Sequence, residues 1–324
     1  MEAASIPAGG ALRRTRGAAD RVGDGLVYGL TALAAMLGVI VVFAIIWRVA
    51  DGAWPAIKAY QLAFLWHADW NAPLSKFGAR ELIVGTLLTS FGAILLATPL
   101  SIAIGLFLSE LAPPVIRMPI GALVDMLAAV PSVVVGLWGI YVLAPLDARH
   151  VQPFIHSFLG WIPIFGGDPH TESTAFTAIV VLTIMAIPIT SSICRELFIG
   201  VPSELEEGSI GLGATRWEMV KTVVVPSVRG GVVAAVVLGL GRALGEAIAV
   251  TQVYGNFIPL HVSLFSSGDT IASRVANQYQ GAVSDIQVSA LIYLALILLV
   301  ITFLSNLAAQ RIVKWFGVQT MGGE

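Results

Sequence analysis

The segment that decides the fold runs from Glu204 to Asn256 and reads ELEEGSIGLGATRWEMVKTVVVPS followed by VRGGVVAAVVLGLGRALGEAIAVTQVYGN. Its first half is polar and rich in glutamate, whereas its second half is apolar and long enough to cross a membrane. Arg242 and Glu246 lie deep inside the apolar half. A polar connection that leads into an apolar span with charged residues is typical of a membrane protein that meets a charged solute.

The composition of the whole chain agrees with this interpretation. Hydrophobic residues make up 57% of the 324 residues and charged residues 12%, against about 45–50% and 25% in soluble domains. We therefore expect an integral membrane protein. Cys194 is the single cysteine, which excludes an internal disulfide, and the five histidines lie outside the apolar runs without ligand spacing. We expect no metal site, no cofactor and no nucleic-acid partner.

Apolar windows of about 20 residues predict the membrane-spanning helices. Six segments qualify, and the predicted fold class is all-α and polytopic. They are Leu26–Trp47, Val84–Leu108, Ile120–Leu143, Phe176–Cys194, Val232–Val253 and Val288–Leu307. The first apolar run is about 22 residues long, which exceeds the 7–15 residues of a signal-peptide core and indicates a retained helix.

Lysine and arginine placement predicts the orientation. Eleven of these residues fall on the side of the N-terminus and six on the opposite side, so both termini are expected in the cytoplasm. Residues 1–25 are expected to form a basic, disordered cytoplasmic tail and residues 317–324 a short one. A single transmembrane domain over residues 26–316 lies between them, and its longest cytoplasmic loop is 196–229.

Two features of the third span and the segment after it stay open. Pro131 predicts a kink, which is the simpler interpretation, or a hinge. The stretch FIHSFLGWIPIFGG in the loop 144–175 is too short to span a bilayer and too apolar for a free loop. It predicts an interfacial or re-entrant piece, and any of the outer loops could contact a protein that delivers the solute.

The loop 196–229 predicts two short helices joined by a turn. Ser203 is placed to cap the first, and glutamates come after it near the positive end of the helix dipole. Gly211 and Gly213 would end that helix, and Thr215 would cap a second one that enters the membrane past Pro226. From the residues alone, an ordinary surface loop explains the pattern equally well.

The spacing of this loop resembles the EAA loop of ABC-importer permeases, written EAA-x3-G-x9-I-x-L-P. Glu207, Gly213 and Pro226 match, while the two alanines are Gly208 and Ser209 and both aliphatic residues are valine. In that family the loop seats in a groove of a cytoplasmic ATPase. The resemblance therefore implies that Glu207 contacts the ATPase and Gly213 makes the turn.

The charged span is the second candidate site. Arg242 lies thirteen residues past Arg229, or roughly 20 Å along a helix, which is well inside a hydrocarbon core of about 30 Å. If the helix is continuous, Glu246 falls on the same face at i+4, and Asn256 lies on that face at the outer end. The rest of that face is small, and small residues allow close helix approach; they are Gly231, Ala235, Gly239 and Ala249. Gly241 and Gly245 would do the same. Arg242 and Glu246 form either a buried ion pair that fixes packing or a site where the arginine offers donors to a passing oxyanion, held in place by Glu246. Glu246 could also accept a proton from hydrogen phosphate.

The run GLGRALGEAIAV, with YGN after it, resembles the permeases of phosphate ABC importers, and among them the C-type subunits. Supporting stretches are ELIVGTLLTS, ATPLSIAIGLFLSELAP and LAAVPSVVVGLWGIYVLAP, and the resemblance covers roughly residues 65–315. It implies the type I ABC importer fold in a bacterial inner membrane. It also implies an A-type permease subunit as heterodimer partner, a cytoplasmic ATPase dimer, an extracytoplasmic phosphate-binding protein and inorganic phosphate as the transported ion.

The chain has no GxxxxGK[ST] phosphate loop, so ATP hydrolysis is expected on a separate chain and not here. Three alternatives stay open. The first is a secondary, ion-coupled anion transporter with Arg242 and Glu246 as a titrating pair. The second is a permease for another oxyanion, such as sulfate or molybdate. The third is a permease relative that acts as a sensing partner.

Overall fold

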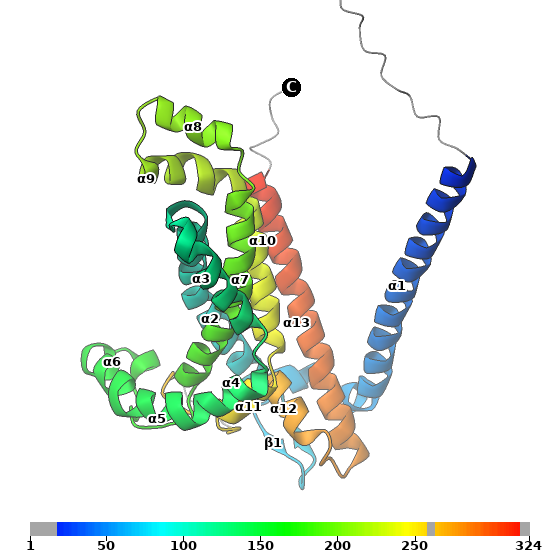
Figure 1. The fold of residues 1–324 in the computed structure, drawn as a ribbon. Helices are drawn as coiled ribbons and strands as arrows, with labels where there is room; N and C mark the ends of the chain where they lie inside the picture. Colours follow the sequence, from blue (N-terminus) through cyan, green and yellow to red (C-terminus); the bar gives the residue numbers. More distant parts are fainter. Residues whose placement is uncertain (1–17, 258–262, 318–324) are drawn as a thin grey trace, which may run out of the picture. The chain divides into compact units, whose positions relative to one another are not determined.

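The computed structural model describes residues 18–257 and 263–317, which form an all-α protein with a small two-stranded hairpin (Figure 1). The predicted fold class is confirmed. The expected terminal tails lie outside the described residues, except that residues 18–25 and Gly317 belong to helices. Among the described residues, those from Ala18 to Arg48 form one unit and those from Val49 onward a second one. The helix bundle, both of its ends and the candidate sites belong to the second unit.

The described helices and strands have the bounds α1 (Ala18–Tyr60), β1 (Trp70–Asn71), β2 (Lys76–Phe77), α2 (Arg80–Leu106), α3 (Pro114–Ala128), α4 (Ser132–Trp138), α5 (Ala144–Leu146), α6 (Gln152–Leu159), α7 (Ala175–Ile199), α8 (Ser203–Gly211), α9 (Arg216–Met219), α10 (Val225–Gly245), α11 (Ile248–Val253), α12 (Ile271–Gln278) and α13 (Asp285–Gly317). Short 3-10 or π-helical turns continue several of them, such as the π-helical turn Phe107–Leu111 after α2.

Within the described residues, six helical stretches are long and apolar enough to cross a membrane. The number agrees with the prediction from the sequence. They are Gly23–Leu65, Arg80–Leu111, Ser132–Leu159, Ala175–Ile199, Arg216–Gly245 and Asp285–Ile312.

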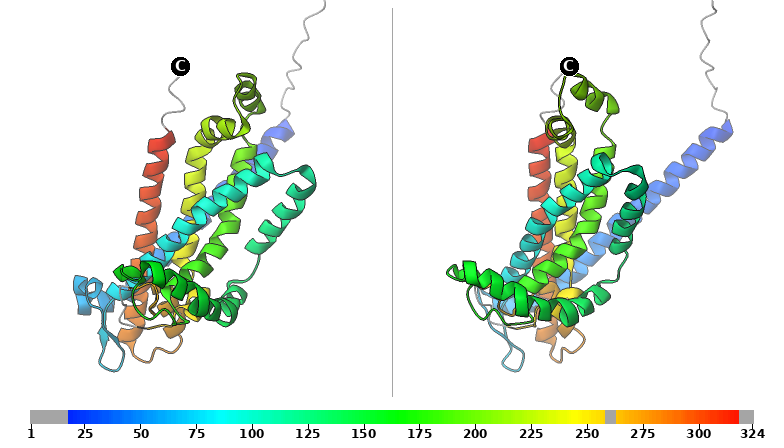
Figure 2. Two further views of the ribbon diagram at one scale, coloured as in Figure 1. Left: turned by 90° about the vertical axis from the view of Figure 1, so that its left-hand side faces the viewer. Right: turned by 60° about the vertical axis from the view of Figure 1, so that its left-hand side comes forward.

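The third stretch differs from the predicted span Ile120–Leu143. α3 ends at Ala128, and Pro131 adopts an extended conformation before α4 begins at Ser132. Proline lacks an N–H and disfavours a helical residue before it, so it ends one helix and starts the next. The prediction of one continuous span is therefore wrong. Figures 1 and 2 show α4 to α6 running across the end of the bundle that also carries α12.

The centre of the fold is formed by α2, α7, α10 and α13, which lie side by side (Figures 1 and 2). α2 and α7 approach closely because glycine and small residues face each other. A Cβ atom on Gly105 of α2 would stand 3.0 Å from the Cβ atom of Cys194 on α7. Farther along, the Thr183 hydroxyl donates to the Ala93 carbonyl across the same pair. Such van der Waals contact and interhelical hydrogen bonding hold helices together where lipid removes the hydrophobic driving force.

Different short elements pack at the two ends of this bundle. α8 and α9 lie at one end, and the hairpin, α11 and α12 lie at the other (Figure 1). At the α8–α9 end, Phe198, Met219 and Val224 are buried in one apolar cluster that ties the short helices to α7 and α10. At the α12 end, Phe64 stacks on Tyr293 with ring centroids 4.6 Å apart. Both ends are therefore anchored to the central helices.

Candidate functional site

The helix that carries Arg242 is interrupted directly after it. α10 ends at Gly245, Glu246 has an extended conformation (φ −72°, ψ 114°), and α11 begins at Ile248. The predicted continuous span Val232–Val253 is therefore wrong. Gly241 and Gly245 weaken the end of α10 because glycine has low helix propensity. The Glu246 carboxylate accepts a hydrogen bond from the Ala249 N–H at 3.4 Å, which favours a new helix start.

Arg242 and Glu246 line a groove of about 550 Å³ between α7, α10 and α13. Both residues are half-buried. The other lining residues are apolar or glycine except for Asn306 of α13, and they are Ile189, Val237, Leu238, Gly241 and Gly245. The groove thus concentrates an arginine, a carboxylate and an amide in apolar surroundings.

The guanidinium of Arg242 is not engaged by the rest of the described chain. Its Nε atom is buried and has no hydrogen-bond partner, and no ion pair joins it to Glu246 among the described residues. The i+4 geometry that would pair them is lost because the backbone leaves the helix at Glu246. Since an unpartnered cation in an apolar span is costly, Arg242 is poised to bind an anion or a group from another chain.

The two glycines next to Arg242 do not have the predicted role within this chain. A Cβ atom on Gly241 or Gly245 would meet nothing within 4 Å, whereas one on Gly239 would stand 2.7 Å from the Thr190 hydroxyl. Close helix approach is therefore made at Gly239, as predicted for the small-residue face, and not at Gly241 or Gly245. Gly241 and Gly245 instead leave the groove open.

Asn256 does not line the groove. It has a positive φ of 54°, its amide donates to the Thr251 carbonyl at 3.1 Å, and its side-chain oxygen accepts from Ser273 at 3.1 Å. The expectation that it continues the Arg242 face fails because both α10 and α11 end before it. Asn306 is the groove residue that the sequence interpretation missed; its only signal is an amide inside an otherwise apolar span.

A buried ion pair holds Asn256 in place at the α12 end. Asp269 and Arg274 lie 2.7 Å apart, and their side chains are 1% and 7% exposed. Arg274 also donates to the Asn256 carbonyl at 3.4 Å and lies over the Trp70 ring. These contacts join α12 to the hairpin and to the chain after α11, so Arg274 has a structural role.

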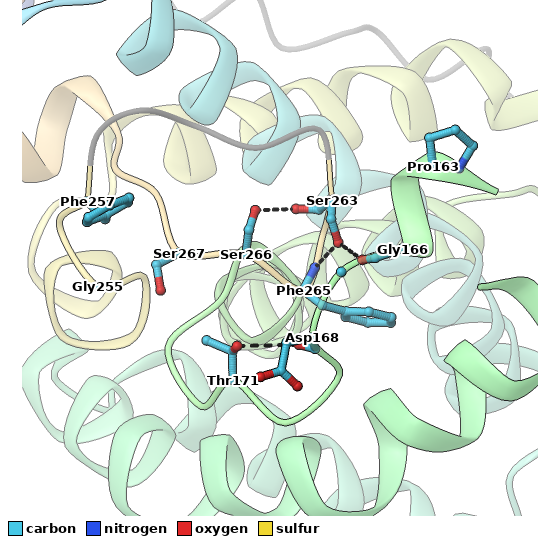
Figure 3. A pocket seen from close by; sticks show the side chains of 11 residues that line it. Pro163, Gly166, Asp168, Thr171, Gly255, Phe257, Ser263, Phe265, Ser266 and Ser267 are labelled. Carbon is cyan, nitrogen blue, oxygen red and sulfur yellow. Dashed lines mark hydrogen bonds between the residues drawn. The ribbon is translucent and has the colours of Figure 1, made fainter. Parts of the chain in front are cut away.

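The α12 end also carries a pocket of about 680 Å³, formed by two loops (Figure 3). Its lining includes Asp168 and Thr171 from one loop and Ser263, Ser266 and Ser267 from the other. The hydroxyls are already used. Ser263 donates to the Gly166 carbonyl, Ser266 to Ser263, and Ser267 to Ser173. The pocket is therefore a recess between loops and not a preorganised anion site.

At the opposite end, α8 and α9 form the predicted helix–turn–helix. Gly213 has a φ of +93°, which only glycine adopts without strain. Thr215 caps α9 in a capping box with Glu218, as predicted. The predicted cap at Ser203 is wrong because α8 already includes Ser203, and Pro202 takes the position before it. Pro226 lies at the start of α10, directly after the π-helical turn Val220–Val224 that continues α9 into α10.

Four of the five predicted coupling residues lie together on this element, and the fifth, Pro226, lies in α10. Glu207, Gly208 and Ser209 are consecutive in α8, and Glu207 and Gly208 are exposed. Large apolar side chains are exposed beside them, namely Leu205, Ile210, Leu212 and Trp217. A surface that combines exposed apolar residues with an acidic one is typical of an interaction site.

The inner side of α8 faces a polar pocket of about 270 Å³. Glu206 and Arg216 of the α8–α9 element line it, together with Glu110 of the π-helical turn after α2 and Arg117 of α3. Burial, followed by repulsion from Glu110 and Glu207, raises the pKa of Glu206. The α8–α9 element therefore contacts the bundle through charged side chains, and the charge of Glu110 affects the pKa of Glu206.

Comparisons with known proteins agree with this architecture. Residues 97–318 match the family described as binding-protein-dependent transport system inner membrane component. The phosphate transport system permease protein PstC of Pasteurella multocida is 45% identical over 271 residues, which cover 81% of this chain and 84% of that protein. PstC of Mesorhizobium japonicum is 41% identical over 301 residues, covering 91% and 92%.

Solved structures show the same fold. A chain of a bacterial alginate ABC transporter, crystallised with an alginate-bound periplasmic protein, superposes with a TM-score of 0.59 at 21% identity, covering 91% of this chain and 99% of that chain. A chain of the MetNI methionine ABC transporter in an inward-facing conformation gives 0.55 at 18% identity, covering 76% and 99%. The chain belongs to the binding-protein-dependent transport system inner membrane components and, within them, to the PstC permease family.

Proposed function

We propose that this chain forms one half of the membrane pathway of an ATP-driven importer of inorganic phosphate in the bacterial inner membrane. The observation that carries the proposal is the groove in which the Arg242 guanidinium has a buried, unpartnered Nε atom. The curated relatives, which are named as phosphate transport permeases, support the choice of substrate.

Arg242 supplies the attraction for the anion. A guanidinium offers a planar fork of N–H donors that matches two oxygens of a phosphate, and charge-assisted hydrogen bonds of this kind are the strong ones. Glu246, at the same groove, offers an acceptor for the P–OH proton of hydrogen phosphate. Sulfate carries no such proton at neutral pH, so its oxygens would face the carboxylate without a hydrogen bond, and the groove would favour phosphate.

A second, A-type permease subunit is proposed to close the groove. A Cβ atom on Gly241 or Gly245 would meet no other described atom within 4 Å, and Gly245 is exposed. A partner helix that packs there would enclose the anion between two chains. A lone groove on one chain would leave Arg242 facing lipid, and the resemblance to phosphate permeases supports an A-type subunit, not a second copy of this chain, as the partner.

A separate ATPase dimer is proposed to bind the α8–α9 element, with both termini on the same, cytoplasmic side. The exposed Glu207 and the apolar side chains beside it support this docking surface. Movement of α8 would reach α2 and α3 through the pocket that Glu206 and Arg216 share with Glu110 and Arg117. An extracytoplasmic phosphate-binding protein would deliver its ion at the α12 end, where two loops form a recess.

The experiment is labelled-phosphate uptake into proteoliposomes that contain this chain, an A-type partner, the ATPase and the binding protein, with excess sulfate as competitor. ATP-dependent, sulfate-resistant uptake is expected. Uptake that needs an ion gradient and no ATP would favour a secondary carrier instead. ATP-dependent uptake that sulfate or molybdate abolishes would indicate a permease for another oxyanion.

A further inference from the structure

Asn306 is a polar residue inside an apolar helix. The candidate membrane span Asp285–Ile312 contains Asn306 in its last two turns. Asn306 is half-buried, and no hydrogen bond joins its side chain to another described residue. An amide carries two donors and an acceptor, which cost free energy in hydrocarbon when they are left unpaired. Asn306 therefore faces water, another chain or a solute.

The fold brings Asn306 to the groove that holds Arg242. Ile301 of α13 packs against the apolar cluster that contains Leu240 and Leu244, which lie two positions before and two after Arg242. Asn306 lies five residues farther along α13, or about 7.5 Å at 1.5 Å per residue. In Figure 1, α13 runs from the α12 end toward the α8–α9 end. Asn306 thus stands on the side of Arg242 that leads toward α8 and α9.

We propose that Asn306 is a direct ligand of the transported oxyanion, at the next position along the groove after Arg242. This inference rests on the proposed function. The amide N–H group donates to an anion oxygen, and the amide carbonyl accepts from a protonated one, so the side chain matches both faces of hydrogen phosphate.

A neutral ligand at this point has a physical advantage. A second cation beside Arg242 would hold the anion too tightly, because translocation requires binding that is strong enough for entry and weak enough for release. Asn306 accepts the ion from Arg242 without adding charge. The groove contains no second arginine or lysine among its described lining residues.

The test uses the reconstituted importer and the initial rate of labelled-phosphate uptake over a range of phosphate concentrations. Asn306→Asp keeps the shape of the side chain but adds a negative charge. We expect a rise in KM of at least about tenfold, because like charges repel. Asn306→Leu, which removes the donors without adding charge, is expected to raise KM less. Ser305→Ala, on the same helix but outside the groove lining, is the matched control and is expected to leave KM unchanged.

Co-purification of the A-type partner is measured for each variant. A wild-type KM in Asn306→Asp would overturn the inference. The inference would also be overturned if Asn306→Asp and Asn306→Leu both lost the partner subunit while Ser305→Ala kept it. That result would assign Asn306 to an interface between chains. If the wild-type importer shows no ATP-dependent phosphate uptake, the proposed function fails before Asn306 is tested, so the two failures are distinguishable.

Discussion

At the scale of the residue, Glu246 has two tasks that substitution can separate. Its carboxylate accepts from the Ala249 N–H at the start of α11 and also lines the groove with Arg242. Glutamine keeps an oxygen that can accept the backbone hydrogen bond but removes the negative charge. The fold of α11 is therefore expected to survive Glu246→Gln, whereas the discrimination against sulfate is not.

We predict that Glu246→Gln lowers the preference for phosphate over sulfate by at least about tenfold, since an unpaired or mismatched buried polar group costs about 1–3 kcal/mol. The measurement is inhibition of phosphate uptake by sulfate. Glu172→Gln, at an exposed carboxylate just before α7, is the control. Unchanged sulfate resistance in Glu246→Gln would refute the role in selectivity.

Local signals at this scale were predictable, but long-range ones were not. The capping box at Thr215 and the turn at Gly213 depend on neighbouring residues and were predicted. The break at Glu246 was missed because apolar periodicity continues through it without a proline. Asn306 was missed because its importance depends on lying beside Arg242, which is 64 positions away in the sequence.

At the scale of the element, the α8–α9 unit depends on the backbone of Gly213. Nothing lies within 4 Å of a Cβ atom added to Gly213 or to Gly211, but only Gly213 has a positive φ, of +93°. A side chain at Gly213 therefore strains the backbone without any steric clash. This difference between two exposed glycines in one loop gives a matched pair for mutation.

We predict that Gly213→Ala weakens coupling between ATP hydrolysis and uptake, because a left-handed conformation costs an L-residue about 1–2 kcal/mol and shifts the turn. Gly211→Ala is expected to behave as the wild type. The ratio of phosphate imported to ATP hydrolysed measures the effect. Equal ratios in the two variants would show that the turn geometry does not matter for coupling.

The order of the helices was predictable at this scale because apolar length identifies each span. The interruption at Pro131 was underestimated as a kink or hinge, although proline chemistry explains it. The direction in which α4 to α6 run could not be predicted, since it depends on packing at the α12 end (Figure 2). A sequence window does not contain that information.

At the scale of the whole molecule, the α12 end is held by a buried charge pair. Asp269 and Arg274 are 1% and 7% exposed and 2.7 Å apart. Removing one partner of such a pair leaves the other charge buried and uncompensated. The stability of this end therefore depends on both residues.

We predict that Arg274→Gln destabilises the chain by about 3–5 kcal/mol, the usual cost of breaking a buried pair. Arg149→Gln, at an exposed arginine, is expected to have little effect. Thermal unfolding of the complex in nanodiscs measures both. If the two variants unfold at the same temperature, the pair does not hold the α12 end.

The central claim is that Arg242 holds the anion during translocation, and uptake by Arg242→Gln tests it most directly. The variant is reconstituted with the A-type partner, the ATPase and the binding protein, and assembly is checked by co-purification. We predict normal assembly and a loss of ATP-dependent phosphate uptake of at least about tenfold, because charge-assisted hydrogen bonds contribute about 1.5–3 kcal/mol each. Uptake at the wild-type rate, or loss of the assembled complex in place of loss of transport, would contradict the claim.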